Sequence, residues 1–179
     1  TTAIALHRDV TADTLLTQIA TSRRNGDTAW RLLAGYRGRH GFDQVISAIA
    51  AERDAVARQH LVSALRLSSE EAAATTLLSI ARSDGSDRVR AEAIQGYVML
   101  AGSGGLAQAL EVAESDASPE VQNRAVSSLA RLPSNVSVPA LLALARTSPR
   151  FIVRKAAVTA LGRTDDPRAT AYLEELVAK

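Results

Sequence analysis

Arginine recurs at the same position of a sequence repeat. Arg58, Arg90 and Arg154 occupy the same place in a pattern that repeats every 32 residues, and Gln122 stands where a fourth arginine would fall. A guanidinium group presents five donors in a planar fork, which suits a carboxylate inside the protein or a phosphate of a ligand. We favour a structural ladder of buried or half-buried arginines, with a phosphate-binding row as the alternative.

A second basic feature is the arginine-rich segment of residues 23–40. This segment also contains Trp30 and Tyr36, and Asp27 is its one acidic residue. Arginines mixed with aromatic rings can grip phosphates and stack on bases, so nucleic acid is a possible partner. The alternative, which we favour, places Trp30 in the core with solvated arginines around it. The candidate nucleic-acid residues are Arg23, Arg24, Arg31, Arg37 and Arg39.

Catalytic and metal chemistry find little support. Cysteine is absent, and the three histidines, His7, His40 and His60, have no partner histidine at helical spacing. Acid pairs such as Glu70-Glu71 read as a helix start, where negative charge meets the positive end of the helix dipole. We predict no catalytic residue, no metal site and no cofactor, and therefore a protein that is not an enzyme.

Two apolar patterns with the same period indicate which elements position these residues. The first aligns Ala57, Val89, Val121 and Val153, each followed by apolar residues four, five and eight positions on, as in Ala93, Ile94 and Tyr97. The second aligns Leu77-Leu78, Ala109-Leu110 and Leu141-Leu142. Both have the spacing of one face of a helix. Each unit is therefore a helix pair, whose first and second members we call helix A and helix B.

Helix breakers separate the patterns. Ser118-Pro119 and Ser148-Pro149 are expected to open A helices, and Gly102, Gly104 and Gly105 lie between A and B of one unit. The expected units are residues 22–53, 54–85, 86–117, 118–149 and 150–179, after an N-terminal cap or degenerate repeat over 1–21. Thr11 to Arg24 reads as one more helix.

The best-matched unit shows a family resemblance. Val153-Arg154, Ala157-Val158 and Leu161-Gly162 fit the pattern V-R-x-x-A-[VI]-x-x-L-G, so the chain resembles short bacterial HEAT repeats of the phycobilin-lyase type. The resemblance implies an all-α fold, a right-handed α-solenoid of about five stacked helix-turn-helix repeats in a single domain. It also implies that A helices lie on the convex side and B helices on the concave side. In HEAT families the recurrent arginine commonly pairs with an aspartate or a backbone carbonyl. The resemblance implies Asp54 and Asp87 as the aspartate partners, because they lie close to the arginines in the sequence.

Small and polar side chains occupy the positions between the core residues of the B helices, which suits a groove for a protein. We therefore predict a non-enzymatic scaffold that binds a protein, or a neighbouring domain of its own chain, along the B helices. The predicted partner-binding residues are Gln44, Ser47, Thr76, Ser79, Gln108, Glu111, Tyr172 and Glu175.

Two alternatives stay open. One is a nucleic-acid-binding module, which the formal charge of only +2 does not favour. The other is an accessory domain of a larger enzyme, of the bilin lyase or zinc aminopeptidase type, because the chain starts without Met. No stretch is apolar enough to insert into a membrane. We expect a cytoplasmic location, with a periplasmic or extracellular one open if the domain is excised from a larger protein.

Overall fold

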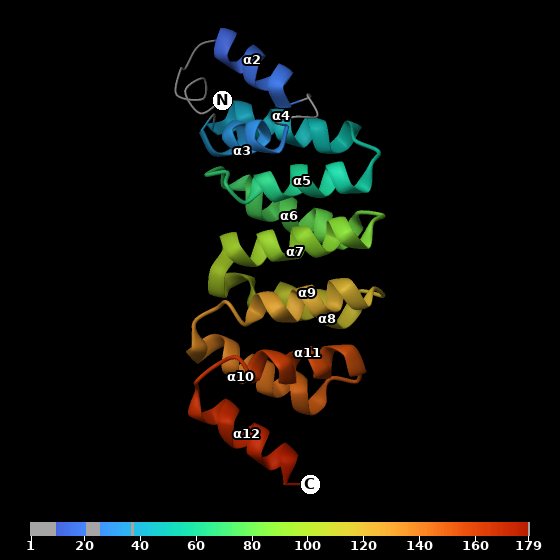
Figure 1. Ribbon diagram of the computed structural model, residues 1–179, viewed down its shortest axis with the longest axis vertical. Helices are drawn as coiled ribbons and strands as arrows, with labels where there is room; N and C mark the ends of the chain where they lie inside the picture. The colour runs from blue at the N-terminus through green and yellow to red at the C-terminus, as the bar shows by residue number, and fades with distance from the viewer. Residues whose placement is uncertain (1–9, 21–25, 37, 179) are drawn as a thin grey trace.

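Helix pairs stack along one long axis. The computed structural model describes residues 10–20, 26–36 and 38–178, and every regular element within these ranges is helical. Figure 1 shows the pairs one below another, with α2 (Val10–Ala20) at one end and α12 (Pro167–Val177) at the other. The predicted all-α solenoid is confirmed.

The helices, which are numbered along the chain, fall into two layers. The A layer contains α3 (Gly26–Tyr36), α5 (Ala55–Leu65), α7 (Asp87–Ala101), α9 (Pro119–Leu129) and α11 (Phe151–Leu161). The B layer contains α4 (Gly38–Ala51), α6 (Ala72–Ser83), α8 (Leu106–Ser115), α10 (Ser134–Thr147) and α12.

The two apolar patterns form the core. Leu65, Leu129 and Leu161 of the A helices are fully buried, and so are Leu77 and Ala109 of the B helices. The buried residues make one continuous cluster from α2 to α12, because each pair covers its apolar stripe with the neighbouring pairs. At the far end of the array, Leu176 and Val177 of α12 remain exposed.

The two layers are unequally spaced. Consecutive A helices pack directly on one another, whereas consecutive B helices make few contacts. Fully buried alanines, Ala93, Ala125 and Ala157, recur at one position of the A helices, and small side chains allow helices to approach closely. The A helices therefore approach one another more closely than the B helices do. The expectation that the B helices line the concave side stays a prediction.

The helix boundaries agree with the predicted breakers in most places. Ser118 is the N-cap of α9, and Pro119 is its first residue. The prediction for Ser148 is wrong, because this residue ends α10 and α11 begins only at Phe151. The Ser148 amide donates to the carbonyl of Leu144 at 3.1 Å, which completes the last turn of α10. Gly102 has a φ of 54°, which favours glycine, and begins the 3-10 helix η1 (Gly102–Gly105) between α7 and α8.

The N-terminal helix belongs to the array. α2 packs against α3, Leu16 is fully buried, and the Thr17 hydroxyl donates to Oε1 of Gln44 in α4 at 2.9 Å. The helix predicted for Thr11 to Arg24 ends at Ala20, and residues 21–25 lie outside the described ranges. Of the helices that the structure describes, none combines the length and the apolar character needed to cross a membrane.

Candidate protein-interaction surfaces

The arginine row ties consecutive helix pairs together. Nε and Nη2 of Arg58 donate to the Asp84 carboxylate at 2.9 and 3.0 Å, and those of Arg90 donate to Asp116 at 2.7 and 3.0 Å. Nη1 of each arginine donates to the carbonyl six residues earlier, Glu52 at 3.1 Å for Arg58 and Asp84 at 2.9 Å for Arg90. Asp84 therefore joins two arginines, through its carboxylate and its carbonyl.

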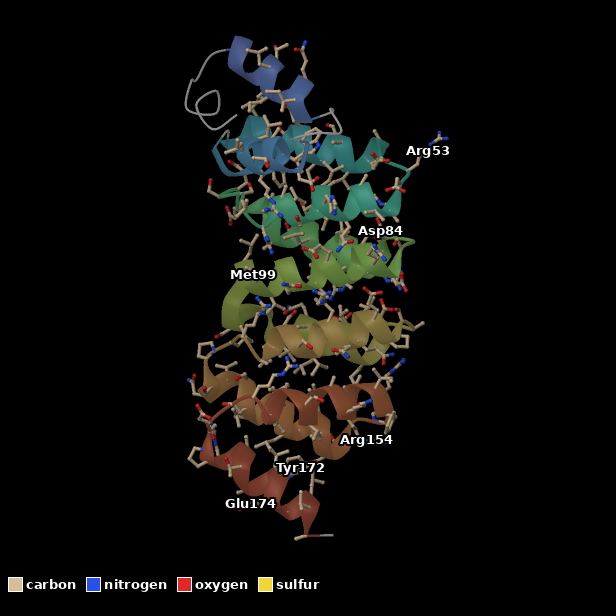
Figure 2. The ribbon with its side chains drawn as sticks, in the orientation of Figure 1. Arg53, Asp84, Met99, Arg154, Tyr172 and Glu174 are labelled. Atoms are coloured by element: carbon tan, nitrogen blue, oxygen red, sulfur yellow. The ribbon has the colours of Figure 1, made fainter. Side chains whose placement is uncertain are left out.

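This geometry corrects the predicted acid partners. Asp54 caps α5 by accepting from the amide of Ala57 at 2.8 Å, and Asp87 accepts from the hydroxyl of Ser118 at 3.2 Å. Both lie at the start of an A helix, whereas the arginine reaches the end of the B helix that follows it. Figure 2 shows Arg53 and Asp84 at the edge of the array where B helices end and A helices begin, with Met99 at the opposite edge. The structural interpretation of the row is the better one, since the guanidinium groups of Arg58 and Arg90 are occupied by carboxylates.

The row changes at two positions together. Gln122 replaces the third arginine, and Ser148 replaces the aspartate that would pair with it. The Gln122 amide still donates to the carbonyl of Asp116 at 2.8 Å, and Arg154 donates to that of Ser148 at 2.7 Å. The hydrogen bonds to backbone carbonyls therefore continue along the array, whereas the ion pair between side chains is missing at positions 122 and 148.

Arg154 lies at a cavity near the end of the array. The cavity has a volume of about 560 Å³. Its lining residues come from α10, α11 and α12: Ala145, Arg146, Arg154, Tyr172, Glu175 and Leu176. Among the described residues, no carboxylate pairs with Arg154.

Asp84 and Asp116, which we call the ladder aspartates, have lowered pKa values. Burial by itself would raise the pKa of Asp84, but the hydrogen bonds from the Arg58 guanidinium and the Ser86 amide outweigh it and lower the pKa below the ordinary 3.8. In the same way, the pKa of Asp116 is lowered by Arg90 and the Ser118 amide against the effect of burial. Both carboxylates are therefore charged at neutral pH, as an ion-pair ladder requires.

The predicted B-helix residues, which we call the B surface, fall into different environments. Ser47, Ser79, Glu111 and Glu175 are exposed, and Gln44, Thr76 and Gln108 are half-buried. Glu111 pairs with Arg82 of α6, and Glu175 lies 3.6 Å from Arg146 of α10. These pairs join neighbouring B helices and neutralise the acids that would have made this surface negative.

Tyr172 is a core residue rather than an exposed contact. It is 6% exposed, and the guanidinium carbon of Arg146 lies 5.0 Å from the centre of its ring. Figure 2 shows Tyr172 where α12 meets the preceding helix pair. The prediction that Tyr172 presents its side chain to a partner is therefore wrong, because α12 uses this ring to pack against α10.

Gln108 on the B surface has an unusual environment. Its Oε1 is the one fully buried side-chain oxygen, within the part of the chain that the structure describes, for which no hydrogen-bond donor is found. By contrast, Oε1 of the buried Gln95 accepts from Arg124. A buried carbonyl oxygen without a donor costs stability.

The predicted nucleic-acid residues do not gather into a site. Arg23, Arg24 and Arg37 lie outside the described residues. Arg31 is exposed, and Arg39 donates to Asp43 at 3.0 Å and lies 5.7 Å from the centre of the Phe42 ring. Trp30 is half-buried and packs against the core, as the structural alternative predicted.

Two adjoining hollows lie on the A helices. One, of about 260 Å³, lies between α9 and α11. Its lining is Asn123, Ser127, Ala130, Ile152, Lys155, Ala156, Thr159, Ala160 and Arg163. The other, of about 310 Å³, extends to α7, with a lining of Gln95, Asn123, Arg124, Ser127, Ser128, Arg131 and Arg163. Because they share Asn123, Ser127 and Arg163, they form one depression across three A helices, and we call these lining residues the A surface.

A comparison with known families explains the repeated geometry. Residues 106–179, which include α8 to α12, match the family model described as HEAT repeats. The match covers the C-terminal part of the array, so these residues resemble HEAT repeats. A comparison with curated proteins finds no match. The family match does not distinguish the phycobilin-lyase type, so that finer resemblance stays a prediction.

HEAT repeats generally serve as non-enzymatic scaffolds for protein interactions. Among the residues that the structure describes, no group of three or more His, Asp or Glu side chains is placed to hold a metal ion.

Sequence reasoning missed the A surface and the ladder aspartates. The repeat carried a signal for both: Asp84 and Asp116 each follow their arginine by 26 residues. Asn123 with Lys155, Ser127 with Thr159 and Arg131 with Arg163 are likewise 32 residues apart, so they align on adjacent A helices.

Proposed function

We propose that this HEAT array is a non-enzymatic scaffold that holds a protein partner against its A surface. The observation that carries the proposal is the continuous depression formed by the two hollows across α7, α9 and α11. A partner segment that fills these hollows would make the close, complementary packing that is typical of the core of a protein interface.

Exposed apolar side chains continue this surface toward the N-terminus. Leu67 and Met99 are each 48% exposed, and they align with Arg131 and Arg163 in the repeat. Large apolar side chains of this kind supply binding energy when a partner covers them. The edge at which A helices end thus changes from apolar to basic along the array.

The arginine ladder supports the proposal by fixing the helices that carry the surface. Arg90 connects the ends of α6 and α8, so the angle between two units is set by hydrogen bonds as well as by the core. A surface that is already in its binding conformation loses less entropy when the partner associates.

The B surface remains the competing prediction. Gln44 lines a hollow with residues of α2, and Tyr172 and Glu175 line the cavity near Arg154, so hollows are found near both ends of this layer. They lie at opposite ends of the array, and Glu111 and Glu175 are already paired with arginines. An accessory role in a larger enzyme stays a prediction as well.

One pair of matched variants tests the two surfaces. Ser127→Trp fills the depression of the A surface, and Ser79→Trp places the same ring on the B surface; both serines are exposed, so neither change should disturb the core. Peptides are selected from a phage-displayed random library on the wild-type protein, and their Kd values are then measured by fluorescence anisotropy. We expect at least tenfold weaker binding to Ser127→Trp and unchanged binding to Ser79→Trp. The opposite result would assign binding to the B surface.

A further inference from the structure

The A surface carries positive charge that no acidic lining residue balances. Arg124, Arg131, Lys155 and Arg163 line the two hollows, and no acidic residue does so among the described residues. We infer that this depression binds an acidic segment of a protein, with carboxylates at Arg131, Lys155 and Arg163. The inference rests on the proposed function and specifies the chemistry of the partner.

Three of the four cations are available to a ligand. The guanidinium of Arg124 is held by Gln95. For Arg131, Lys155 and Arg163, by contrast, no side-chain hydrogen bond or ion pair to another described residue is found, and all three are exposed. Elsewhere in the array, Arg58 and Arg90 each have a carboxylate partner. Opposite charge from a partner would complement the A surface, steer association and favour acidic sequences over others.

The spacing of the cations fits a run of acidic residues. Lys155 and Arg163 are eight positions apart along α11 and its C-terminal end, which corresponds to roughly 12 Å along a helix axis. Carboxylates four residues apart in an extended chain are separated by a similar distance, about 13 Å. A short run of glutamates or aspartates can therefore reach both cations.

The lining of the depression favours a protein over a nucleic acid. Ala130, Ile152, Ala156 and Ala160 line the same hollow as Lys155 and Arg163 and provide apolar contacts there. Neither hollow is lined by an aromatic side chain from the described residues, so stacking of bases has no platform here. A peptide offers both acidic and apolar side chains, whereas a phosphate backbone offers only charge.

The change from apolar to basic side chains along the array also predicts the orientation of the bound segment. Apolar Leu67 and Met99 precede basic Arg131 and Arg163 at the same edge. A partner segment should therefore place apolar residues near α5 and α7 and its acidic residues near α9 and α11.

The test uses a fluorescein-labelled synthetic peptide in which two leucines precede five glutamates, and the same peptide with glutamines in place of the glutamates. Binding to the whole chain is measured by fluorescence anisotropy. We expect the glutamate peptide to bind at least tenfold more tightly than the glutamine peptide and to lose affinity as salt is added. Equal binding of the two peptides, or no binding of the glutamate peptide at millimolar concentration, would overturn the inference.

Charge-reversed variants locate the site. Lys155→Glu/Arg163→Glu should weaken the glutamate peptide at least tenfold, whereas Arg53→Glu/Arg88→Glu should change it less than twofold. All four side chains are exposed, and the control pair changes net charge equally without touching the hollows. A neutral pair, Lys155→Gln/Arg163→Gln, should weaken binding less than the charge reversal, and melting temperatures verify that each variant is folded. An equal loss in the control pair would overturn the assignment.

A single-stranded oligothymidine of matched length provides the nucleic-acid comparison. We expect it to bind more weakly than the glutamate peptide, and tighter binding that depends on Lys155 and Arg163 would overturn the inference in favour of nucleic acid. If the peptide does not bind but selected peptides are still lost from Ser127→Trp, the acidic chemistry is wrong while the proposed function stands.

Discussion

Arg90 donates two hydrogen bonds to the carboxylate of Asp116 and a third to the carbonyl of Asp84, so one side chain connects the ends of α8 and α6. The side chains of Arg90 and Asp116 are only 16% and 9% exposed. An ion pair in this position is shielded from water, and loss of one member leaves the other charge poorly solvated. The relationship makes stability sensitive to single substitutions in the ladder.

Arg90→Ala should lower the free energy of unfolding by about 2–4 kcal/mol, because Asp116 loses its partner and two helix ends lose a shared donor. Urea denaturation followed by circular dichroism measures the change. Arg88→Ala is the matched control, since Arg88 is exposed and its substitution should cost less than about 0.5 kcal/mol. Equal effects of the two substitutions would contradict a structural role for the ladder.

Gln122 and Ser148 should behave as a coupled pair. Gln122→Arg alone adds a guanidinium without a carboxylate, and Ser148→Asp alone adds a buried carboxylate without a guanidinium, since both positions are 4% exposed. In the double variant the two new groups restore the missing ion pair. We expect the double variant to be more stable than the sum of the single changes by about 1–3 kcal/mol. A double-mutant cycle of unfolding free energies checks this, and additive effects would show that the two positions do not interact.

Stability should depend on acid pH through Asp84 and Asp116. Their folded-state pKa values are lowered below 3.8, so the unfolded chain binds more protons than the folded one as pH falls. The stabilisation is therefore complete at neutral pH and is lost progressively from about pH 5 downward. Urea midpoints measured between neutral pH and about pH 3 should fall more for the wild type than for Asp84→Asn/Asp116→Asn. If the urea midpoints of the wild type and the double variant fall equally with pH, the acid sensitivity does not come from Asp84 and Asp116.

Gln108→Met should not destabilise the protein, because it removes a buried carbonyl oxygen that lacks a donor. We expect a change between no effect and a gain of about 1 kcal/mol. Gln95→Met is the matched comparison and should cost about 1–2 kcal/mol, since the Gln95 oxygen accepts from Arg124. Thermal melts of both variants measure the difference, and a larger loss at Gln108 would mean that its amide has a structural role.

The sequence by itself determined the helix pairs, their period and the residues of the core. The positions of Leu65, Leu129 and Leu161, and of breakers such as Pro119, depend on the periodicity and conformation of the local backbone, which neighbouring residues specify. It also indicated that Arg58 and Arg90 belong to a structural row, because a recurrent arginine at one helical position must meet a recurrent environment.

Only the tertiary structure decided which groups meet across the array. Arg90 pairs with Asp116 rather than with a nearer acid because the fold of one helix pair brings the end of α8 back to the start of α7, and no local pattern specifies that contact. The closer spacing of the A layer, the burial of Tyr172 and the hollows beside Lys155 and Arg163 result from packing between repeats. How closely whole helices approach one another is a property of the assembled stack, and the period alone does not contain it.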